Sequence, residues 1–369
     1  MARRYNSPLP AFMLRRIIPL FLSGTLLVQC APAVSEGKVP LAEKARIQKY
    51  PEPVVQTKAQ LDASFAEWAR AARNPINFRL SGELKNQWRE LISESSWGEY
   101  ARRCTTAFMD TGQVSITLEY RDYVRLCAAW RDAAFRSSLS DAEESVLQFA
   151  TQCVRELLRP GMSDFEKLLA IHDYLIQHSR YEETGANTVE HLLRKGSGSC
   201  EAYSAALSVM LEIAGIPVRV VTGNAGGPHA WNLVCIDKEW YHVDATWNDP
   251  LVGDGSREVL SHAYFCLSDA EMARTHKWNC AAYPASGKQT ASYYRRKDIY
   301  FTSFNAFMRA ALCAYSRGQS CFEGYLTQYG SPEEFQRNLQ RFSHPSVPER
   351  INWTGPDASA GAVIVSFGP

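Results

Sequence analysis

Cys200 is the residue of this chain whose surroundings best suit nucleophilic chemistry. It follows Gly196-Ser197-Gly198-Ser199 and begins a strongly helical pattern, with Ser199 in position to cap the helix. Unpaired N–H groups and the helix dipole favour negative charge at such a position, so a thiol there becomes a thiolate more easily. The same N–H groups can hold the oxyanion that forms when a thiolate attacks a carbonyl carbon. We also expect Gly196 and Gly198 to let a substrate backbone approach closely.

His229 and Asp244 are the residues expected to activate this thiol. His229 follows Gly226-Gly227-Pro228 and begins a strand, which places it at a cleft as a general base. Asp244 lies on the next strand, where its carboxylate could fix the imidazole tautomer and stabilise the imidazolium. A Cys–His–Asp set of this kind attacks amide or acyl carbonyl groups.

These two strands must pair in one particular register for His229 to reach Asp244. If residues 236–239 make the hairpin turn, Cys235 faces Trp240 and Asn232 faces Val243. His229 and Asp244 are then diagonal neighbours on one sheet face, roughly 7–8 Å apart, which their side chains can span. A slip of one residue would put them on opposite faces.

The supporting elements are also readable in the sequence. Ser163-Asp164-Phe165-Glu166 is a capping box, and it opens a helix with one apolar face. The helix that Cys200 begins extends to about residue 214, because Gly215 and then Pro217 follow. Residues 218–221, 230–236 and 239–245 are rich in β-branched and aromatic side chains and predict three strands.

Other roles for the residues around this site stay open. Cys200 could be a structural thiol or half of a disulfide. His242 alternates with Asp244 on one strand face and could compete for it, but only His229 lies beside the glycine-rich loop. Tyr181 could add an oxyanion donor or simply pack. Asn248-Asp249-Pro250 predicts a turn.

The tryptophans near these strands could line a substrate groove, although aromatic residues in strands are mostly core. They are Trp231, Trp240 and Trp247. We predict a core position for Trp240 and leave Trp231 open.

Four motifs in this order resemble the transglutaminase-like core. They are Gly198-Ser199-Cys200-Glu201-Ala202-Tyr203, Gly215-Ile216-Pro217-Val218-Arg219, His229-Ala230-Trp231-Asn232, and the run from Trp240 through Asp244 to Pro250. A tail then resembles the bacterial transglutaminase/protease-like branch related to cytokinesis protein 3. It consists of Tyr264-Phe265, Ser268-Asp269 and His276.

The resemblance covers residues 163–278 and implies an α+β, papain-like fold. In that fold a helix bearing the Cys packs on an antiparallel sheet bearing the His and the Asp. Motif for motif, Cys200, His229 and Asp244 fall on the family's catalytic triad. Ala202 departs from the Gly that many relatives have there, which leaves the triad untouched.

The N-terminus is typical of an export signal. Arginines at positions 3, 4, 15 and 16 precede an apolar run over residues 17–28, too short for a comfortable membrane span. The signal peptide would comprise residues 1–33 and end at Ala31-Pro32-Ala33, or stop at residue 29 and leave Cys30 for a lipid that attaches the chain to a membrane. Gln29 departs from the small residue expected before a lipid-modified Cys. A buried apolar helix is the alternative interpretation of this run.

The rest of the chain divides into a linker and three folded parts. Residues 34–58 contain three prolines and predict a linker. An N-terminal α/β module (59–150), a catalytic core (151–290) and a C-terminal α/β module (291–369) follow. The sequence from Ser64 to Ala71 resembles that from Ser303 to Ala310, so the two modules could be repeats, unless two amphipathic helices merely look alike.

The cysteines, the histidines and the net charge limit which disulfides, bound groups and partners we expect. Of the ten cysteines, the pairs Cys313–Cys321 and Cys266–Cys280 are the first guesses for disulfides, with buried free thiols as the alternative. No Cys-x-x-Cys pair is present, and the histidines show no ligand spacing, so we expect neither a metal nor a cofactor. The net charge of +1 disfavours a nucleic-acid partner.

These observations predict an exported thiol acyl-transfer enzyme acting on peptide or Gln-side-chain amides through a Cys thioester. It would be a transglutaminase or a cysteine protease or amidase of the periplasm, cell envelope or secreted fraction, with a protein or peptide as its substrate. A non-catalytic binding or assembly protein of the cell envelope is the alternative, because a fold alone does not certify activity. A thiol–disulfide protein ranks last, since the chain lacks Cys-x-x-Cys.

Overall fold

The structure is a computed structural model that describes most of the chain after residue 52. The described residues are 53–93, 97–108, 112–249, 251–252, 257–258, 260–287, 292–344, 348, 350–355 and 361–368. The predicted signal peptide and Cys30 lie outside them. Within them, no helix combines the length and apolarity needed to cross a membrane.

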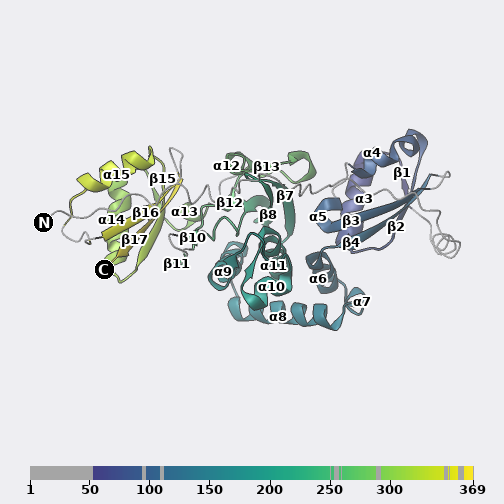
Figure 1. Cartoon of the computed structure of the whole chain (residues 1–369), viewed down its shortest axis with the longest axis horizontal. Helices are drawn as coiled ribbons and strands as arrows, with labels where there is room; N and C mark the ends of the chain where they lie inside the picture. The colour runs from purple at the N-terminus through teal and green to yellow at the C-terminus, as the bar shows by residue number, and fades with distance from the viewer. Residues whose placement is uncertain are drawn as a thin grey trace.

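A five-stranded antiparallel sheet lies at the centre of the molecule (Figure 1). Its strand order is β12 (Phe265–Leu267), β9 (Glu239–Val243), β8 (Pro228–Ile236), β7 (Val218–Asn224) and β13 (Lys277–Trp278). The three predicted strands are therefore confirmed as β7, β8 and β9. Together with the helix of Cys200, they make the α+β core that the sequence predicts.

The register of β8 against β9 is the predicted one. Asn232 pairs with Val243, and Cys235 pairs with Trp240. Asp237 and Lys238 make the connecting turn, and both have positive φ angles, 53° and 66°. A two-residue turn of this kind matches the twist of the strands that it joins, so it fixes the register locally.

Helix α11 (Cys200–Ile213) packs against this sheet and is buried on all sides. Every residue from Ala202 to Leu211 is buried. Helix α9 (Asp164–His178) begins with the predicted capping box, in which Ser163 and Glu166 bond each other's backbone N–H. A helix that is apolar all round must be enclosed by other elements, which explains the neighbours of α11.

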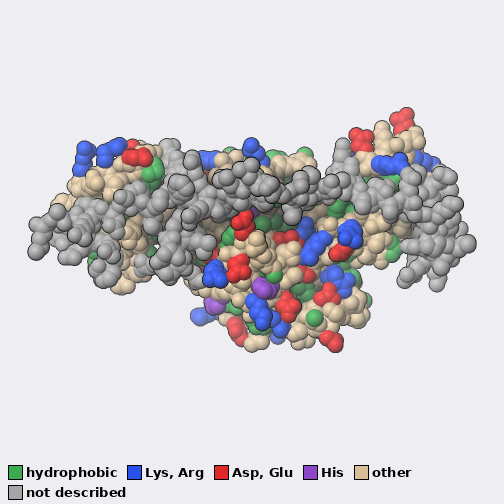
Figure 2. Space-filling view, in the orientation of Figure 1, with side chains coloured by type: hydrophobic (Ala, Val, Ile, Leu, Met, Phe, Trp, Pro, Cys, Tyr) green, Lys and Arg blue, Asp and Glu red, His purple; other side chains and the backbone are tan. Residues whose placement is uncertain are grey.

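Three further helices complete that enclosure. They are α6 (Asp122–Arg131), α8 (Asp141–Leu157) and α10 (Val189–Lys195). In Figure 1, α8 runs beneath α6, α10 and α11 on the side away from the sheet. Helix α6 lies before the predicted boundary at residue 150 and α8 spans it, and both pack on the helix that carries Cys200. On the face seen in Figure 2, acidic and basic side chains are interspersed over these helices.

The N-terminal sheet has the order β1 (Val54–Val55), β2 (Ile76–Leu80), β4 (Gln113–Tyr120), β3 (Ala101–Phe108). Strand β1 pairs in parallel with β2, and helix α3 (Lys58–Arg70) connects them. The linker prediction for residues 34–58 is thus wrong at its end, where the chain already forms β1 and enters α3. Short elements η1 (Gly82–Gln87), α4 (Trp88–Ser93) and α5 (Trp97–Tyr100) precede β3.

The C-terminal sheet has the same arrangement. Its order is β14 (Tyr300–Phe301), β15 (Cys321–Leu326), β17 (Gly361–Gly368), β16 (Arg350–Thr354), with β14 parallel to β15. Helix α14 (Phe304–Ser316) joins the parallel pair, and α15 (Pro332–Arg341) follows β15. Phe307, Phe335 and Trp353 belong to a hydrophobic cluster that this module forms by itself.

The N-terminal and C-terminal modules correspond strand for strand, but not with Ser64 matched to Ser303 as the sequence predicts. Ser303 caps α14, whereas Thr57 caps α3. Ser64, which the sequence comparison paired with Ser303, lies about two turns inside α3. The shared strand order favours the interpretation that the two modules are repeats of one another, which stays a prediction.

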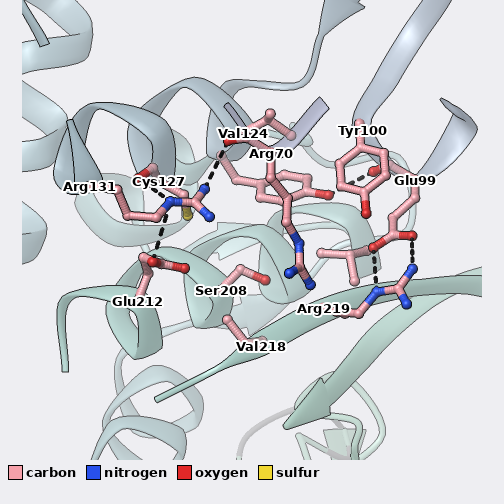
Figure 3. A pocket seen from close by; sticks show the side chains of 12 residues that line it. Arg70, Glu99, Tyr100, Val124, Cys127, Arg131, Ser208, Glu212, Val218 and Arg219 are labelled. Carbon is pink, nitrogen blue, oxygen red and sulfur yellow. Dashed lines mark hydrogen bonds and ion pairs between the residues drawn. The ribbon is translucent and has the colours of Figure 1, made fainter. Parts of the chain in front are cut away.

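A buried ion pair holds the N-terminal module on the central sheet (Figure 3). Arg219 on β7 donates from Nε and Nη2 to the two carboxylate oxygens of Glu99 on α5, at 3.2 and 2.7 Å. Glu99 is 2% exposed. Arg131 contacts Glu212 across the same small cavity. This cavity lies toward the C-terminal end of α11, away from Cys200.

The predicted disulfides are wrong. All nine cysteines within the described residues are free thiols. Cys266 is buried while Cys280 is exposed, and both Cys313 and Cys321 are exposed. Proximity in sequence does not bring two sulfur atoms together, because a disulfide also needs matched Cα separation and direction.

Candidate active site

Cys200 is the first residue of α11, as the sequence predicts. Ser199 occupies the N-cap position, but its hydroxyl does not cap the helix and its Oγ atom is buried without a hydrogen-bond partner. Ser199 therefore has the predicted position but does not make the capping hydrogen bond. Because the first N–H groups of a helix have no intrahelical partner, this leaves them free to bind an oxyanion beside the thiol.

The two glycines before Cys200 have roles in the fold itself, whereas the sequence predicts that they admit a substrate backbone. Gly196 ends α10 in the left-handed conformation, with φ of 69°. A Cβ atom on Gly198 would lie 2.7 Å from the Cβ of Ala202, so Gly198 allows close packing within the protein itself. Neither observation supports the predicted approach of a substrate backbone.

His229 and Asp244 meet in the predicted geometry. His229 Nε2 donates to Asp244 Oδ2 at 2.6 Å. The same imidazole hydrogen-bonds the Cys200 thiol, and Nδ1 is the ring nitrogen left for this contact. The structure thus brings Cys200, His229 and Asp244 together in that order, and their catalytic role stays a prediction.

The charges of the site favour a protonated imidazole. Burial lowers the pKa of His229, but the charge and hydrogen bond of Asp244 and the contact with Cys200 outweigh it and raise the pKa to about 10. Burial raises the pKa of Asp244, but His229 and His276 hold it well below its ordinary value. At neutral pH the pair is therefore an imidazolium and a carboxylate.

Asp244 accepts two further hydrogen bonds. Trp247 donates its backbone N–H to Oδ1 at 3.0 Å, and His276 donates from Nε2 to Oδ2 at 3.0 Å. His276 is fully buried, and its Nδ1 contacts the hydroxyl of Thr275 at 2.8 Å. The sequence placed His276 only in the tail of the resemblance, because no local spacing links it to Asp244.

His242 does not compete for Asp244. Its Nε2 contacts Asp269 Oδ1 at 2.8 Å, and its Nδ1 accepts from Trp231 Nε1 at 2.9 Å. Trp231 is 1% exposed, and its ring stacks on His229 with centroids 5.9 Å apart. Trp231 is therefore a core residue that also supports the imidazole. Trp240 is only partly buried and packs on the edge of a core cluster.

Two aromatic residues lie next to the catalytic candidates. The Trp247 ring centroid is 6.1 Å from that of His229, and its Nε1 is buried without a partner. Tyr181 on β5 (Arg180–Tyr181) pairs in parallel with Gly198 on β6 (Ser197–Gly198). Burial, then the nearby charges of Cys200, Glu183 and Asp244, raise the pKa of Tyr181 to about 12. Tyr181 therefore keeps its phenolic proton close to Cys200.

Asn232 fixes the sheet against the helix of Cys200. Its Nδ2 donates to Ser204 O at 3.0 Å and to Ser208 Oγ at 2.9 Å, both on α11. Asn232 is 1% exposed. Because it lies three residues after His229, this contact sets the distance between the imidazole strand and the Cys200 helix.

A turn covers residues 245–248 and a bend follows at Asp249, while Pro250, the last residue of the predicted turn, lies outside the described residues. Asn248 and Asp249 are both buried. Asn248 donates to His172 Nε2, and Asp249 accepts from the hydroxyl of Tyr203, one turn after Cys200. This turn therefore ties the Asp244 segment to α9 and α11.

Two clusters within the described residues have the composition of metal ligands. They are His172, Asp173 and His262, and His229, Asp244 and His276. In each, the histidine nitrogens that face the carboxylate already hydrogen-bond it. Sequence spacing could not reveal either cluster, because its members come from separate elements.

A family model, two curated relatives and several solved structures match parts of this chain. The family model described as "Transglutaminase-like superfamily" matches residues 151–245. Kyphoscoliosis peptidase of Mus musculus is 24% identical over 215 residues, which cover 50% of this chain and 31% of that protein. Its Homo sapiens counterpart is 24% identical over 178 residues, covering 40% of this chain and 27% of that protein. The chain thus spans less than a third of the length of these two relatives.

Among solved structures, a crystal structure of a TGase matches with a TM-score of 0.25 and 17% identity. The match covers 47% of this chain and 51% of that one.

Proposed function

We propose that this protein is a thiol acyl-transfer enzyme acting on peptide or Gln-side-chain amides, because residues 151–245 match the transglutaminase-like family model. The observation that carries the proposal is the hydrogen-bonded series from Cys200 through His229 to Asp244. A structural cysteine has no need of a buried imidazole held by a buried carboxylate.

The first half of the reaction forms a thioester. The proton of Cys200 is held on His229 as part of the imidazolium, and the thiolate sulfur attacks the amide carbonyl carbon. The oxyanion that forms is stabilised by N–H groups at the start of α11, with the Tyr181 hydroxyl as a further donor. His229 then gives its proton to the departing nitrogen, the C–N bond breaks, and an amine leaves.

The second half releases the acyl group. Water or a primary amine attacks the thioester carbon, and His229 takes a proton from this nucleophile. The C–S bond breaks, and His229 returns the proton to the sulfur of Cys200. Water yields a carboxylic acid, whereas an amine yields a new amide. The word peptidase in the names of the two relatives favours water as the acceptor here.

Export is a second part of the proposal and depends on the N-terminal sequence pattern alone. Residues 1–33 combine a basic start, an apolar run and two candidate cleavage sites. Intact-mass measurement of the protein from its native host tests this. A mature chain that begins at Cys30 with added lipid mass, or just after Ala33, supports export, whereas an uncleaved chain contradicts it.

Mass spectrometry of reaction products tests the catalytic proposal. Wild type and Cys200→Ala are incubated with a peptide mixture and a primary amine. Shortened or deamidated peptides indicate hydrolysis, and amine adducts indicate transfer. Cys235→Ala is the matched control, because Cys235 is also a partly exposed free thiol.

We expect Cys235→Ala to behave as wild type and Cys200→Ala to give no product. Identical products from wild type and Cys200→Ala would contradict the proposal. Absence of products from both, together with slow alkylation of Cys200, would favour a binding or assembly protein.

A further inference from the structure

A second buried network joins the catalytic domain to the C-terminal module at His262. This residue precedes β12, and its Nε2 lies 3.0 Å from Asp173 Oδ1 on α9. Its Nδ1 lies 2.7 Å from Glu323 Oε2 on β15 of the C-terminal module. The imidazole therefore bridges two carboxylates that belong to different parts of the molecule.

The geometry determines the charge of His262. A carboxylate only accepts hydrogen bonds, so both ring nitrogens must carry protons, and His262 is an imidazolium. Burial lowers the pKa of His262, but the two carboxylates outweigh it and raise the pKa to about 9. The other titratable groups that face it are His172 on α9 and the phenols of Tyr293 and Tyr294 on α13 (Tyr293–Arg296).

Glu323 also organises the backbone around His262. Its Oε1 accepts from the N–H of His262 at 2.8 Å, from the Ser261 hydroxyl at 3.2 Å and from the Tyr294 hydroxyl at 2.8 Å. Glu323 is the residue of the C-terminal module that makes these contacts. Its loss would leave several buried donors without an acceptor, which is costly.

The network continues from His262 to the segment that carries Asp244. Asp173 Oδ1 also accepts from His172 Nδ1 at 2.9 Å, and His172 Nε2 accepts from Asn248 Nδ2 at 3.0 Å. Asn248 in turn donates its N–H to the carbonyl oxygen of Asp244 at 3.1 Å. His172 and Asn248 are fully buried, whereas the Asp173 side chain is 26% exposed.

Asn248 also fixes the tautomer of His172. Its Oδ1 accepts from the backbone N–H of Tyr264 at 2.7 Å, so its NH₂ group must face His172. His172 Nε2 is therefore unprotonated, and Nδ1 keeps the proton that it donates to Asp173. A metal ion on Nδ1 would force the proton onto Nε2, against the NH₂ group. The network thus suits hydrogen bonding rather than metal binding.

We propose that Glu323 is a positioning residue, through which the C-terminal module holds the Asp244–His229 pair in its working geometry. Asn248 accepts from the N–H groups of Ser261 and Tyr264, so the loop that Glu323 binds also determines where Asn248 lies. The catalytic consequence rests on the proposed function, whereas the structural coupling does not.

Three variants of the full chain test this proposal. Glu323→Ala removes every contact of the carboxylate. Glu323→Gln keeps an acceptor for the Ser261, Tyr294 and His262 donors, and its amide can donate to a neutral His262. Tyr294→Phe is the matched control, because it removes one hydrogen bond to the same carboxylate and leaves the ion pairs in place.

Two measurements are made on each variant across pH. One is the titration of His229 and His262 by NMR, and the other is the rate at which a small thiol reagent alkylates Cys200. For Glu323→Ala we expect a lower pKa of His229 and an alkylation rate reduced about tenfold at neutral pH. Tyr294→Phe should stay within about twofold of wild type.

Glu323→Gln should differ from wild type only on the acid side. Loss of one carboxylate lowers the pKa of His262, and below that pKa the imidazolium would face the NH₂ group of the amide. Alkylation of Cys200 should then fall further below the wild-type rate as pH decreases, a dependence that a merely structural role of Glu323 would not produce. If Glu323→Ala unfolds, Glu323→Gln still tests the proposal.

A His229 titration and a Cys200 alkylation profile unchanged in both Glu323 variants would overturn the inference. The NMR titration measures the coupling between Glu323 and His229 and does not require that the protein turn over a substrate. A protein that yields no products but shows the expected His229 shift would therefore refute the proposed function and support this inference.

Discussion

Asp244 follows His229 by 15 positions, yet its Oδ2 atom lies 2.6 Å from His229 Nε2 in the protein interior. Asp244 is fully buried, and its carboxylate is compensated by two imidazoles and a backbone N–H. A buried charge is tolerated only when it is paired and hydrogen-bonded in this way. The arrangement sets the protonation state of His229 and hence the reactivity expected of Cys200.

Replacing Asp244 by Asn should change the pH dependence of Cys200. Without the carboxylate, burial dominates, and the pKa of His229 falls from about 10 to its ordinary value of 6.5 or below. At pH 7 to 8 the imidazole is then neutral, and we expect alkylation of Cys200 and any turnover to drop about 100-fold or more.

The same shift has a consequence for stability. The raised pKa of His229 gives a stabilisation that is complete below pH 6.5 and is lost as pH rises through about 10, whereas the lowered pKa of Asp244 gives one that is complete above pH 3.8 and is lost in stronger acid. Asp244→Asn should remove this alkaline loss.

Asp269→Asn is the control for both Asp244→Asn measurements, since Asp269 contacts His242 instead. A wild-type alkylation rate in Asp244→Asn would show that the carboxylate does not tune the imidazole.

His276→Phe tests the second histidine on Asp244. Phenylalanine keeps the ring but removes the Nε2 donor, so the buried carboxylate loses one of its hydrogen bonds. We expect a loss of about 1–3 kcal/mol in the free energy of unfolding and a raised pKa of Asp244.

His276→Gln supplies an amide donor and should recover part of this loss. Urea unfolding at neutral pH measures the change, and the NMR titration of His229 shows whether it reaches the catalytic candidates. If His276→Phe were as stable as wild type, the contact with Asp244 would be energetically neutral.

Local sequence was sufficient to predict the parts of this architecture that depend on local physics. The capping box of Ser163 and Glu166, and the register set by the Asp237–Lys238 turn, each involve residues a few positions apart. That register in turn brought Asp244 within reach of His229.

Contacts that depend on tertiary packing were not predictable in this way. His276 reaches Asp244 across 32 positions, and Glu323 reaches His262 across 61. The disulfide predictions failed for the same reason, because closeness in sequence does not show whether two cysteines have the separation and direction that a disulfide needs. The roles of Cys200, His229 and Asp244 in catalysis stay predictions until products are measured.

Asn232→Ala should loosen the strand of His229 from the helix of Cys200. The change leaves the carbonyl of Ser204 and the hydroxyl of Ser208 without their buried donor, and we expect a cost of about 1–3 kcal/mol. Ser208→Ala removes one of the two contacts and should cost less.

A double-mutant cycle separates this contact from general packing effects. Asn232→Ala and Ser208→Ala should be non-additive in thermal or urea unfolding, because the two side chains touch. Additive costs would mean that the Asn232–Ser208 hydrogen bond contributes no coupling.

Glu99→Ala should break the attachment of the N-terminal module. Arg219 is then left largely buried without its bidentate partner, and such a change costs about 3–5 kcal/mol. The desolvation of the unpaired guanidinium causes most of this cost, so Glu99→Leu combined with Arg219→Met should recover much of it. Urea unfolding of wild type and the two variants measures the effect, and limited proteolysis between residues 101 and 120 reports whether the module loosens first. A double variant less stable than Glu99→Ala alone would show that the ion pair contributes more than desolvation removes.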